Sequence, residues 1–258
     1  MPTYTIPALV IAGPTASGKT ALAVWLARQL EGEIVSFDSV QLYRDFDIGT
    51  AKPSAAELAA VPHHLIGAAD AHHPWTAGEY ARQARPVVED IAGRGKLPVL
   101  VGGTGFYLRA LLQGLSPAPV ADAGLREKLR RRDPERLHRL LRRLDPEAAA
   151  RIQPRDAERA IRALEVRLLT GKPMGDAWRA AEPQPWRELR PLKFGLAPDR
   201  AALYQRIHDR AAAMFAGPIQ EETRRLLPKY PPELRIWTSH GYKQACDIVL
   251  CGAHPAAA

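Results

Sequence analysis

One stretch near the N-terminus decides the fold of this chain: Gly13-Pro14-Thr15-Ala16-Ser17-Gly18-Lys19-Thr20. It fits the phosphate-loop pattern G-x-x-x-x-G-K-[ST], and it lies between an apolar run at residues 8–12 and a helical pattern. A buried strand, a glycine loop and a helix N-terminus together form an anion cradle of backbone N–H groups and helix dipole. The stretch therefore predicts binding of a di- or triphosphate, with Lys19 reaching terminal phosphate oxygens and the Thr20 hydroxyl placed on Mg²⁺.

The length and the cysteine usage limit the class of protein. With 258 residues, the chain is long enough for one large α/β domain or for one domain with an insertion. Its two cysteines, Cys246 and Cys251, are too few for a disulfide framework and lack zinc spacing, which suits a reducing compartment. Because no signal peptide and no apolar run of about 18 residues is visible, we expect a cytoplasmic protein without a membrane anchor.

The positive charge is unevenly distributed. The formal net charge is +8; residues 1–115 carry 9 Lys/Arg and 10 Asp/Glu, whereas residues 116–258 carry 27 and 18. Of those 27 basic residues, 22 are Arg, the side chain best suited to bind phosphate through two hydrogen bonds at once. The asymmetry indicates a polyanionic partner such as nucleic acid. A high-GC genome that favours Arg codons would give the same composition and stays an alternative.

The first 115 residues alternate between strand and helix patterns. Strand patterns cover residues 8–12, 33–37 and 97–101, and helical patterns cover residues 21–30 and 77–92. This βαβ rhythm predicts a parallel sheet flanked by helices. The three strands end in Gly13, Asp38 and Gly102, so we expect these residues to meet around one crevice at the carboxyl edge of the sheet.

The composition changes near Ser116. Helical patterns, rich in Arg, cover residues 125–143 with a break at Asp133-Pro134, a segment from Asp145, and residues 156–170. A further strand pattern covers residues 192–196, and helical patterns follow at 200–214 and 220–227. We interpret residues 118–187 as a helical insertion in an α/β core made of residues 1–117 and 188–258.

Asp38 is the one strand-end carboxylate of the predicted core. There it could accept a proton or hold Mg²⁺ through water, with a loop cap as the structural alternative. The strand at 97–101 ends in glycines, not in the Asp that a P-loop ATPase normally supplies, which argues against an ATP hydrolase. A small-molecule P-loop kinase, with Asp38 as base and the insertion as an Arg-bearing lid, stays open.

Three further groups could serve a ligand. Thr104, after two glycines, offers a hydroxyl to an anion, although a simple glycine turn would look the same. Arg155, Arg159 and Arg162 recur at helical spacing, with Arg151 one turn earlier, and could track a nucleic acid backbone or form a solvated face. The segment from Trp237 to Gln244 mixes aromatic, basic and amide groups that suit stacking on unpaired bases.

Taken in order, these motifs resemble those of the bacterial tRNA dimethylallyltransferase family, prenyltransferases that modify the adenosine next to the anticodon. The resemblance spans nearly the whole chain and implies a P-loop NTPase-like fold. Beyond the phosphate loop, the matching stretches are Asp38-Ser39-Val40-Gln41-Leu42-Tyr43, Asp47-Ile48-Gly49-Thr50-Ala51-Lys52-Pro53, Gly102-Gly103-Thr104-Gly105-Phe106-Tyr107, Asp145-Pro146, Arg159, Arg162-Ala163-Leu164-Glu165-Val166, Thr170-Gly171-Lys172, residues 206–214 and Gly241-Tyr242-Lys243.

The resemblance implies transfer of a dimethylallyl group from dimethylallyl diphosphate to N6 of the adenosine 3′ to the anticodon, with release of diphosphate. It implies Asp38 as general base and Thr104 at the bridging oxygen of the leaving group. It also implies Lys19 and Arg210 on the diphosphate, with Mg²⁺ near Thr20, and a monomer that holds the anticodon stem-loop of tRNA. The implied RNA contacts are Asp38, Ser39, Val40, Gln41, Thr104, Arg126, Arg159, Arg162, Gly241, Tyr242 and Lys243.

Two departures from the family's pattern leave another hypothesis open. Members of the family continue for several dozen residues after Gly-Tyr-Lys, whereas this sequence ends at Ala258 after a stretch unlike theirs. Gly217-Pro218 also stands where the family favours Gly-Leu, so a helix start is expected to shift there. An inactive, truncated tRNA-binding remnant is therefore the third hypothesis, beside the prenyltransferase and the kinase.

Overall fold

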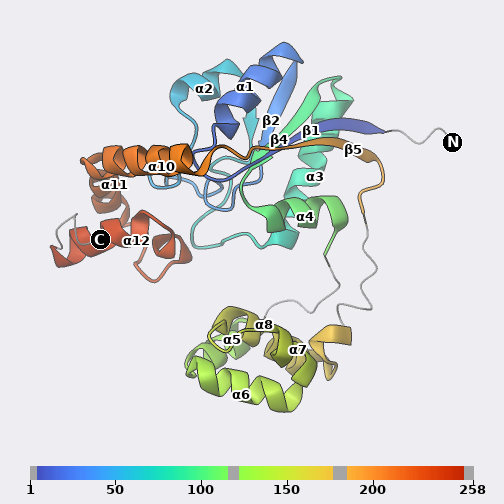
Figure 1. Ribbon diagram of the computed structural model, residues 1–258, viewed down its shortest axis with the longest axis vertical. Helices are drawn as coiled ribbons and strands as arrows, with labels where there is room; N and C mark the ends of the chain where they lie inside the picture. Colours follow the sequence, from blue (N-terminus) through green and yellow to red (C-terminus); the bar gives the residue numbers. More distant parts are fainter. Residues whose placement is uncertain (1–4, 116–121, 177–184, 253–258) are drawn as a thin grey trace. The chain divides into compact units, whose positions relative to one another are not determined.

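The computed structural model describes residues 5–115, 122–176 and 185–252. The chain forms two compact units, Met1–Leu112 with Trp186–Ala258, and Gln113–Pro185 (Figure 1). The expected boundary at residues 117/118 lies outside the described residues, as does the sequence from Ala253 onward. Within the described part of the chain, no helix combines the length and the apolar character needed to cross a bilayer.

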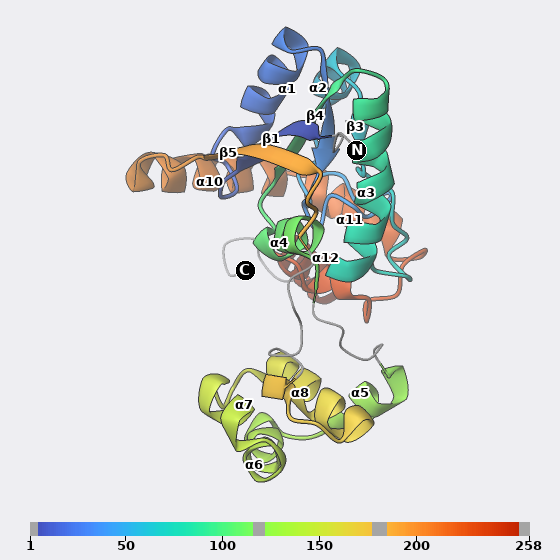
Figure 2. The same cartoon turned by 90° about the vertical axis from the view of Figure 1, so that its right-hand side faces the viewer.

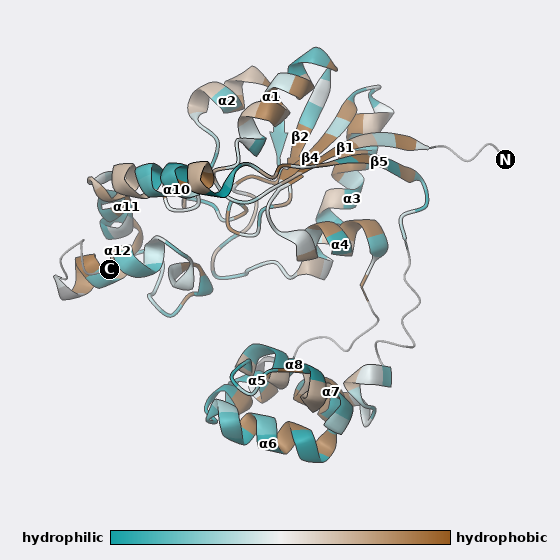
Figure 3. Ribbon diagram, viewed as in Figure 1, coloured by the Kyte–Doolittle hydropathy of each residue, from teal (hydrophilic) through white to brown (hydrophobic). Residues whose placement is uncertain are grey.

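The first unit is built on a parallel sheet, as predicted. Its strands are β1 (Ile6–Ala12), β2 (Gly32–Ser36), β3 (His63–His64), β4 (Leu97–Gly102) and β5 (Leu189–Gly195), in the order β3-β2-β4-β1-β5. All the strand pairs are parallel, with Ile11 opposite Val101 and Val101 opposite Ser36. The central strands are almost continuously apolar because both of their faces are covered (Figure 3).

Helices cover both faces of this sheet, and each face presents a different set of side chains from the same strands. On one face, α1 (Lys19–Gln29) packs on Leu9 and Ile11, and α2 (Ala55–Ala60) lies beside α1. On the other face, α3 (Ala77–Gly93) and α4 (Gly105–Gln113) pack on Ala8 and Val10 (Figures 1 and 2). Neighbouring residues of a strand point to opposite faces, so β1 joins two apolar clusters.

Three local details differ from the sequence patterns. In α1 the fully buried residues are Ala23 and Ala27, whereas Leu30, the last residue of the predicted helical pattern, lies just beyond the helix and is exposed. Small side chains there let the helix approach the sheet closely. The short α2 and β3 were not predicted, because six and two residues are too few for a periodic signal.

The C-terminal part of the first unit forms a second core. It contains α10 (Arg200–Phe215), α11 (Pro218–Leu226), the 3₁₀ helix η1 (Arg235–Thr238) and α12 (Tyr242–Cys251). Phe46 packs there edge-on against Trp237 and Tyr242. Helix α11 begins at Pro218, two residues before the predicted start, because proline fits the first helical position and Gly217 takes the preceding positive φ.

The second unit is a small helical bundle. It includes the helices α5 (Ala123–Arg130), α6 (Pro134–Leu144), α7 (Pro146–Arg151) and α8 (Ala157–Thr170). Asp133, Asp145 and Asp156 cap three of them by accepting backbone N–H groups, which explains the break predicted at Asp133-Pro134. An apolar centre that includes Leu137, Leu141 and Leu164 holds the helices together.

Candidate active site

The carboxyl ends of β1, β2 and β4 meet, as their sequence endings predict. A Cβ atom placed on Gly103 would lie 3.5 Å from the Gly13 carbonyl oxygen and 4.0 Å from Asp38 Oδ2. Three segments separated by many residues thus approach one point at the edge of the sheet. Both distances at Gly103 are ordinary contacts, whereas a Cβ atom on Gly102 would lie 2.6 Å from the Phe37 ring, so the close approach of β4 to the end of β2 requires glycine at position 102.

The loop at residues 13–18 winds directly into α1. Gly18 has φ 86°, and Ala16 has φ 59°, an uncommon value for a residue with a side chain. The N-cap of α1 is Gly18, whose lack of a side chain leaves the N–H groups of the first turn without a side-chain cap. Such unpaired N–H groups at a helix N-terminus are a ready site for phosphate.

Two cations flank this loop. Lys19 Nζ lies 3.2 Å from the Pro14 carbonyl oxygen, and Arg210 Nη1 of α10 lies 3.4 Å from Thr15 Oγ1. Burial lowers the pKa of both side chains, while the charge of Asp38 opposes this shift in each. Partly buried cations are stabilised by a nearby negative charge, so this pair suits an anionic ligand such as diphosphate.

These groups line a cavity of about 650 Å³. Its walls include Thr15, Ala16, Gly18, Lys19, Thr20, Asp38, Val40, Gln41 and Arg210. Across the described ranges, no group of three or more His, Cys, Asp or Glu side chains could hold a metal. The Thr20 hydroxyl in the cavity wall is an oxygen ligand of the kind that Mg²⁺ takes together with phosphate oxygens.

Asp38 both caps the turn that follows β2 and lines the cavity. Its Oδ1 accepts the backbone N–H groups of Val40, at 3.0 Å, and Gln41, at 3.4 Å, which is the loop cap considered above. Among the described residues, no hydrogen bond to Oδ2 is found. Ser39 N–H donates to Thr104 Oγ1 at 3.0 Å, and the Thr104 hydroxyl donates to Ser39 Oγ at 3.2 Å. Asp38 and Thr104 are thus fixed side by side.

Two further recesses adjoin these residues, and their walls were not predicted. One, of about 530 Å³, is lined by Thr104 and by side chains that include Trp75, Phe106 and Arg235; the Phe106 ring is 60% exposed. The other, of about 490 Å³, lies beside Arg210 and has an apolar wall of Ile207, Ala211, Met214 and Phe215. Phe106 and residues 206–214 were quoted in the sequence analysis only as parts of family motifs, and neither recess was predicted from them.

The arginines of the second unit differ in their ion pairing and in the exposure of their side chains. Arg126 and Arg162 both pair with Glu165, whose side chain is fully buried, and Arg126 Nη2 is 2.8 Å from it. Arg159 is 76% exposed and lies 3.4 Å from Asp156. The expectation of four arginines on one helix face is wrong, because Arg151 ends α7 and Arg155 precedes α8.

The aromatic rings near the C-terminus are core residues. Trp237 is 3% and Tyr242 0% exposed, and Trp237 Nε1 donates to the Tyr230 carbonyl oxygen. The interpretation of these rings as base-stacking groups is therefore wrong for this structure. Gly241 has φ 91°, which favours glycine, and Lys243 is exposed beside it.

Comparison with known proteins fits this geometry. A family model described as IPP transferase matches residues 41–254, and one described as isopentenyl transferase matches residues 6–68. The chain belongs to the tRNA dimethylallyltransferase family. Relatives of that name include proteins from Koribacter versatilis, 52% identical over 93% of this chain and 79% of the relative, and from Stenotrophomonas maltophilia, 50% identical over 94% and 80%.

Solved structures of the tRNA dimethylallyltransferase family share the fold. A tRNA isopentenylpyrophosphate transferase from Bacillus halodurans is 35% identical, with TM-score 0.66, over 96% of this chain and 78% of that one. A eukaryotic dimethylallyltransferase acting on tRNA is 28% identical, with TM-score 0.77, over 93% of this chain and 62% of that one. The P-loop NTPase-like fold predicted from the sequence is confirmed.

Proposed function

We propose that this chain transfers a dimethylallyl group from dimethylallyl diphosphate to N6 of the adenosine 3′ to the anticodon in tRNA, releasing diphosphate. One observation carries the proposal: the Asp38 carboxylate and the cations Lys19 and Arg210 line the same cavity at the phosphate loop. A base and a site for a leaving anion are the two requirements of an alkyl transfer to an amine. The names of the relatives give tRNA and the dimethylallyl group, and the diphosphate donor and the adenosine come from the motif resemblance.

The phosphate loop and its cations form the leaving-group end of the site. N–H groups of residues 13–20, Lys19 and Arg210 would hold the diphosphate, and Thr20 would hold the Mg²⁺ that neutralises part of its charge. Charge builds on the diphosphate as the carbon–oxygen bond breaks, so these groups stabilise the transition state more than the bound donor. The apolar recess formed by α10 would receive the hydrocarbon.

Asp38 and Thr104 form the acceptor end. An arylamine is a poor nucleophile, and Asp38 would accept its proton as the new carbon–nitrogen bond forms. Thr104, which accepts the Ser39 N–H, would turn its hydroxyl proton from Ser39 Oγ to the bridging oxygen of the diphosphate. A base flipped out of the anticodon loop would enter the recess beside Phe106, an exposed ring suited to stacking.

Both units would hold the RNA. The insertion at residues 118–187 would grip the anticodon stem-loop through its arginines, with the core at 1–117 and 188–258 holding the reacting groups. The proposed contacts are Asp38, Ser39, Val40, Gln41, Thr104, Arg126, Arg159, Arg162, Gly241 and Lys243. Tyr242 is fully buried, so its proposed part is to hold Gly241 and Lys243 in place without touching the RNA. The same proposal includes a monomer that works in the cytoplasm, where its tRNA substrate occurs.

Incubation with carbon-labelled dimethylallyl diphosphate, Mg²⁺ and unmodified tRNA separates the three hypotheses. Label in the RNA supports the prenyltransferase. ATP consumption with a small acceptor, and no labelled RNA, would instead show a kinase. Retention of tRNA on a filter with neither reaction would show a binding remnant.

A further inference from the structure

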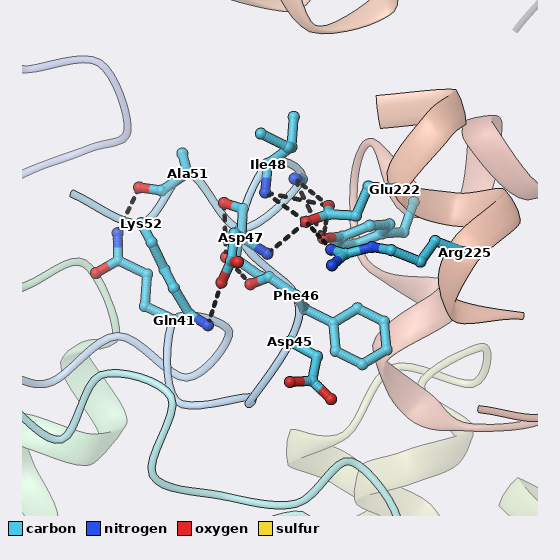
Figure 4. A network of polar contacts seen from close by, with 12 residues as sticks. Gln41, Asp45, Phe46, Asp47, Ile48, Ala51, Lys52, Glu222 and Arg225 are labelled. Carbon is cyan, nitrogen blue, oxygen red and sulfur yellow. Dashed lines mark hydrogen bonds and ion pairs between the residues drawn. The ribbon is translucent and has the colours of Figure 1, made fainter. Parts of the chain in front are cut away.

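The buried carboxylate of Glu222, on α11, collects the backbone N–H groups of three consecutive residues (Figure 4). Its Oε1 accepts from Asp47 at 2.8 Å and from Ile48 at 3.0 Å. Its Oε2 accepts from Ile48 at 3.1 Å and from Gly49 at 3.4 Å. A carboxylate that accepts several N–H groups compensates for its loss of water, and it fixes the loop that donates them.

Tyr242, at the start of α12, completes this clamp. Its hydroxyl donates to Glu222 Oε2 and accepts the Gly49 N–H at 3.3 Å. Burial, together with the charge of Glu222, raises the pKa of the phenol, so it keeps its proton and stays a donor. A Cβ atom on Gly49 would lie 2.5 Å from the Tyr242 ring, which shows how closely the loop is pressed against α12.

The opposite side of the same loop forms part of the candidate active site. Gly49, Thr50 and Ala51 line the cavity that contains Asp38. The Ala51 carbonyl oxygen accepts the Gln41 side-chain amide at 2.9 Å, and Gln41 N–H donates to Asp38 Oδ1. Hydrogen bonds, joined by the short backbone segment of the loop, therefore connect α11 through the loop and Gln41 to the carboxylate of Asp38.

We propose that Glu222 is a positioning residue of the transfer reaction, acting with Tyr242 through the loop at residues 47–51 on Gln41 and Asp38. The inference rests on the proposed function, since it assigns Asp38 the role of base. Its consequence is that helices outside the sheet set the geometry of the reacting groups. Misplacement by about 1 Å costs on the order of a hundredfold in rate, so a shift of this loop is expected to slow transfer.

Three variants test the clamp. Glu222→Gln keeps the size of the side chain but turns an NH₂ donor toward N–H donors, and Tyr242→Phe removes only the hydroxyl. Glu221→Gln is the matched control, because Glu221 is exposed on the same helix. Each variant is compared with the wild type in thermal unfolding, in hydrogen exchange of the amides of residues 47–49, and in the single-turnover transfer rate at saturating donor and tRNA.

For Glu222→Gln, we expect faster exchange at residues 47–49 and a transfer rate lower by at least about tenfold, at a temperature where the variant is folded. Tyr242→Phe should have the same effects in smaller measure, tRNA affinity should stay within about twofold in both, and Glu221→Gln should match the wild type. A purely structural role would lower the unfolding temperature and leave the rate of the folded protein unchanged; that result would overturn the inference.

Exchange at residues 47–49 that is as slow in Glu222→Gln as in the wild type would also overturn the inference, whatever the rate. Failure of the proposed function is visible separately, because then the wild type itself labels no tRNA. In that case the exchange measurement, repeated with inorganic diphosphate, still tests the clamp because it needs no turnover. We expect diphosphate to slow exchange at residues 47–49 in the wild type but not in Glu222→Gln. Exchange in Glu222→Gln that is the same as in the wild type would contradict the clamp.

Discussion

At the scale of single residues, Asp38 has the most specific role. Its Oδ1 accepts the N–H groups of Val40 and Gln41, and in the proposed function Oδ2 would accept the substrate proton. Asp38→Asn keeps an oxygen for the turn and removes the base, so we expect transfer to fall by about 10² to 10⁴. The tRNA dissociation constant, measured by filter binding, should stay within about twofold of the wild type. Normal turnover by this variant would contradict the assignment of Asp38 as base.

The lowered pKa of Glu33, at the start of β2, predicts that the stability of the fold depends on pH. Hydrogen bonds from Arg94, with a smaller contribution from His64, outweigh burial and lower its pKa from 4.5 to about 2. A carboxyl whose pKa is lower in the folded state stabilises the fold above the unfolded pKa, and this contribution is lost as the pH falls from 4.5 toward 2.

Glu33→Gln should therefore lower the free energy of unfolding at pH 7 by up to about 3 kcal/mol, and the difference from the wild type should vanish toward pH 2. The control is Glu31→Gln, since Glu31 pairs with Lys96 at an exposed position, where ion pairs contribute little. Chemical denaturation at a series of pH values measures both. A constant difference across that range would show that the charge of Glu33 is not the cause.

At the scale of elements, the 47–51 loop and α12 are packed closely against each other beside the site. Gly49→Ala would place a methyl group 2.5 Å from the Tyr242 ring, and we expect a loss of about 1–3 kcal/mol of stability together with slower transfer. Gly93→Ala is the control, because open space surrounds Gly93 at the end of α3. Thermal unfolding of both variants checks this; equal unfolding temperatures would refute the close packing.

The elements also show how far the sequence could be interpreted. The phosphate loop and the strand ends at Gly13, Asp38 and Gly102 could be placed because apolar runs and glycines are local signals. The burial of Trp237 and Tyr242 could not, because composition does not tell which face of a segment packs inward. Nor could the role of Glu222, whose partners lie about 175 residues earlier in the chain.

At the scale of the whole molecule, the positive charge belongs mainly to the half that contains the helical insertion. Exposed Arg159 is free to approach a phosphate, whereas Arg126 is tied to buried Glu165. Arg159→Ala should weaken tRNA binding and reduce the slope of log affinity against log salt by about 1. Arg126→Ala should mainly lower the stability of the bundle. An unchanged salt dependence in Arg159→Ala would remove this residue from the RNA interface.

The central claim is that the phosphate loop holds a leaving group while carbon, not phosphorus, is transferred. The most direct measurement is one turnover with dimethylallyl diphosphate labelled in both its carbon and its phosphorus, followed by separation of tRNA nucleosides and free phosphates. We predict that carbon label enters an N6-substituted adenosine in tRNA and that phosphorus label is released as diphosphate in equal amount. Phosphorus label in the acceptor, or carbon label confined to unreacted donor, would contradict the account.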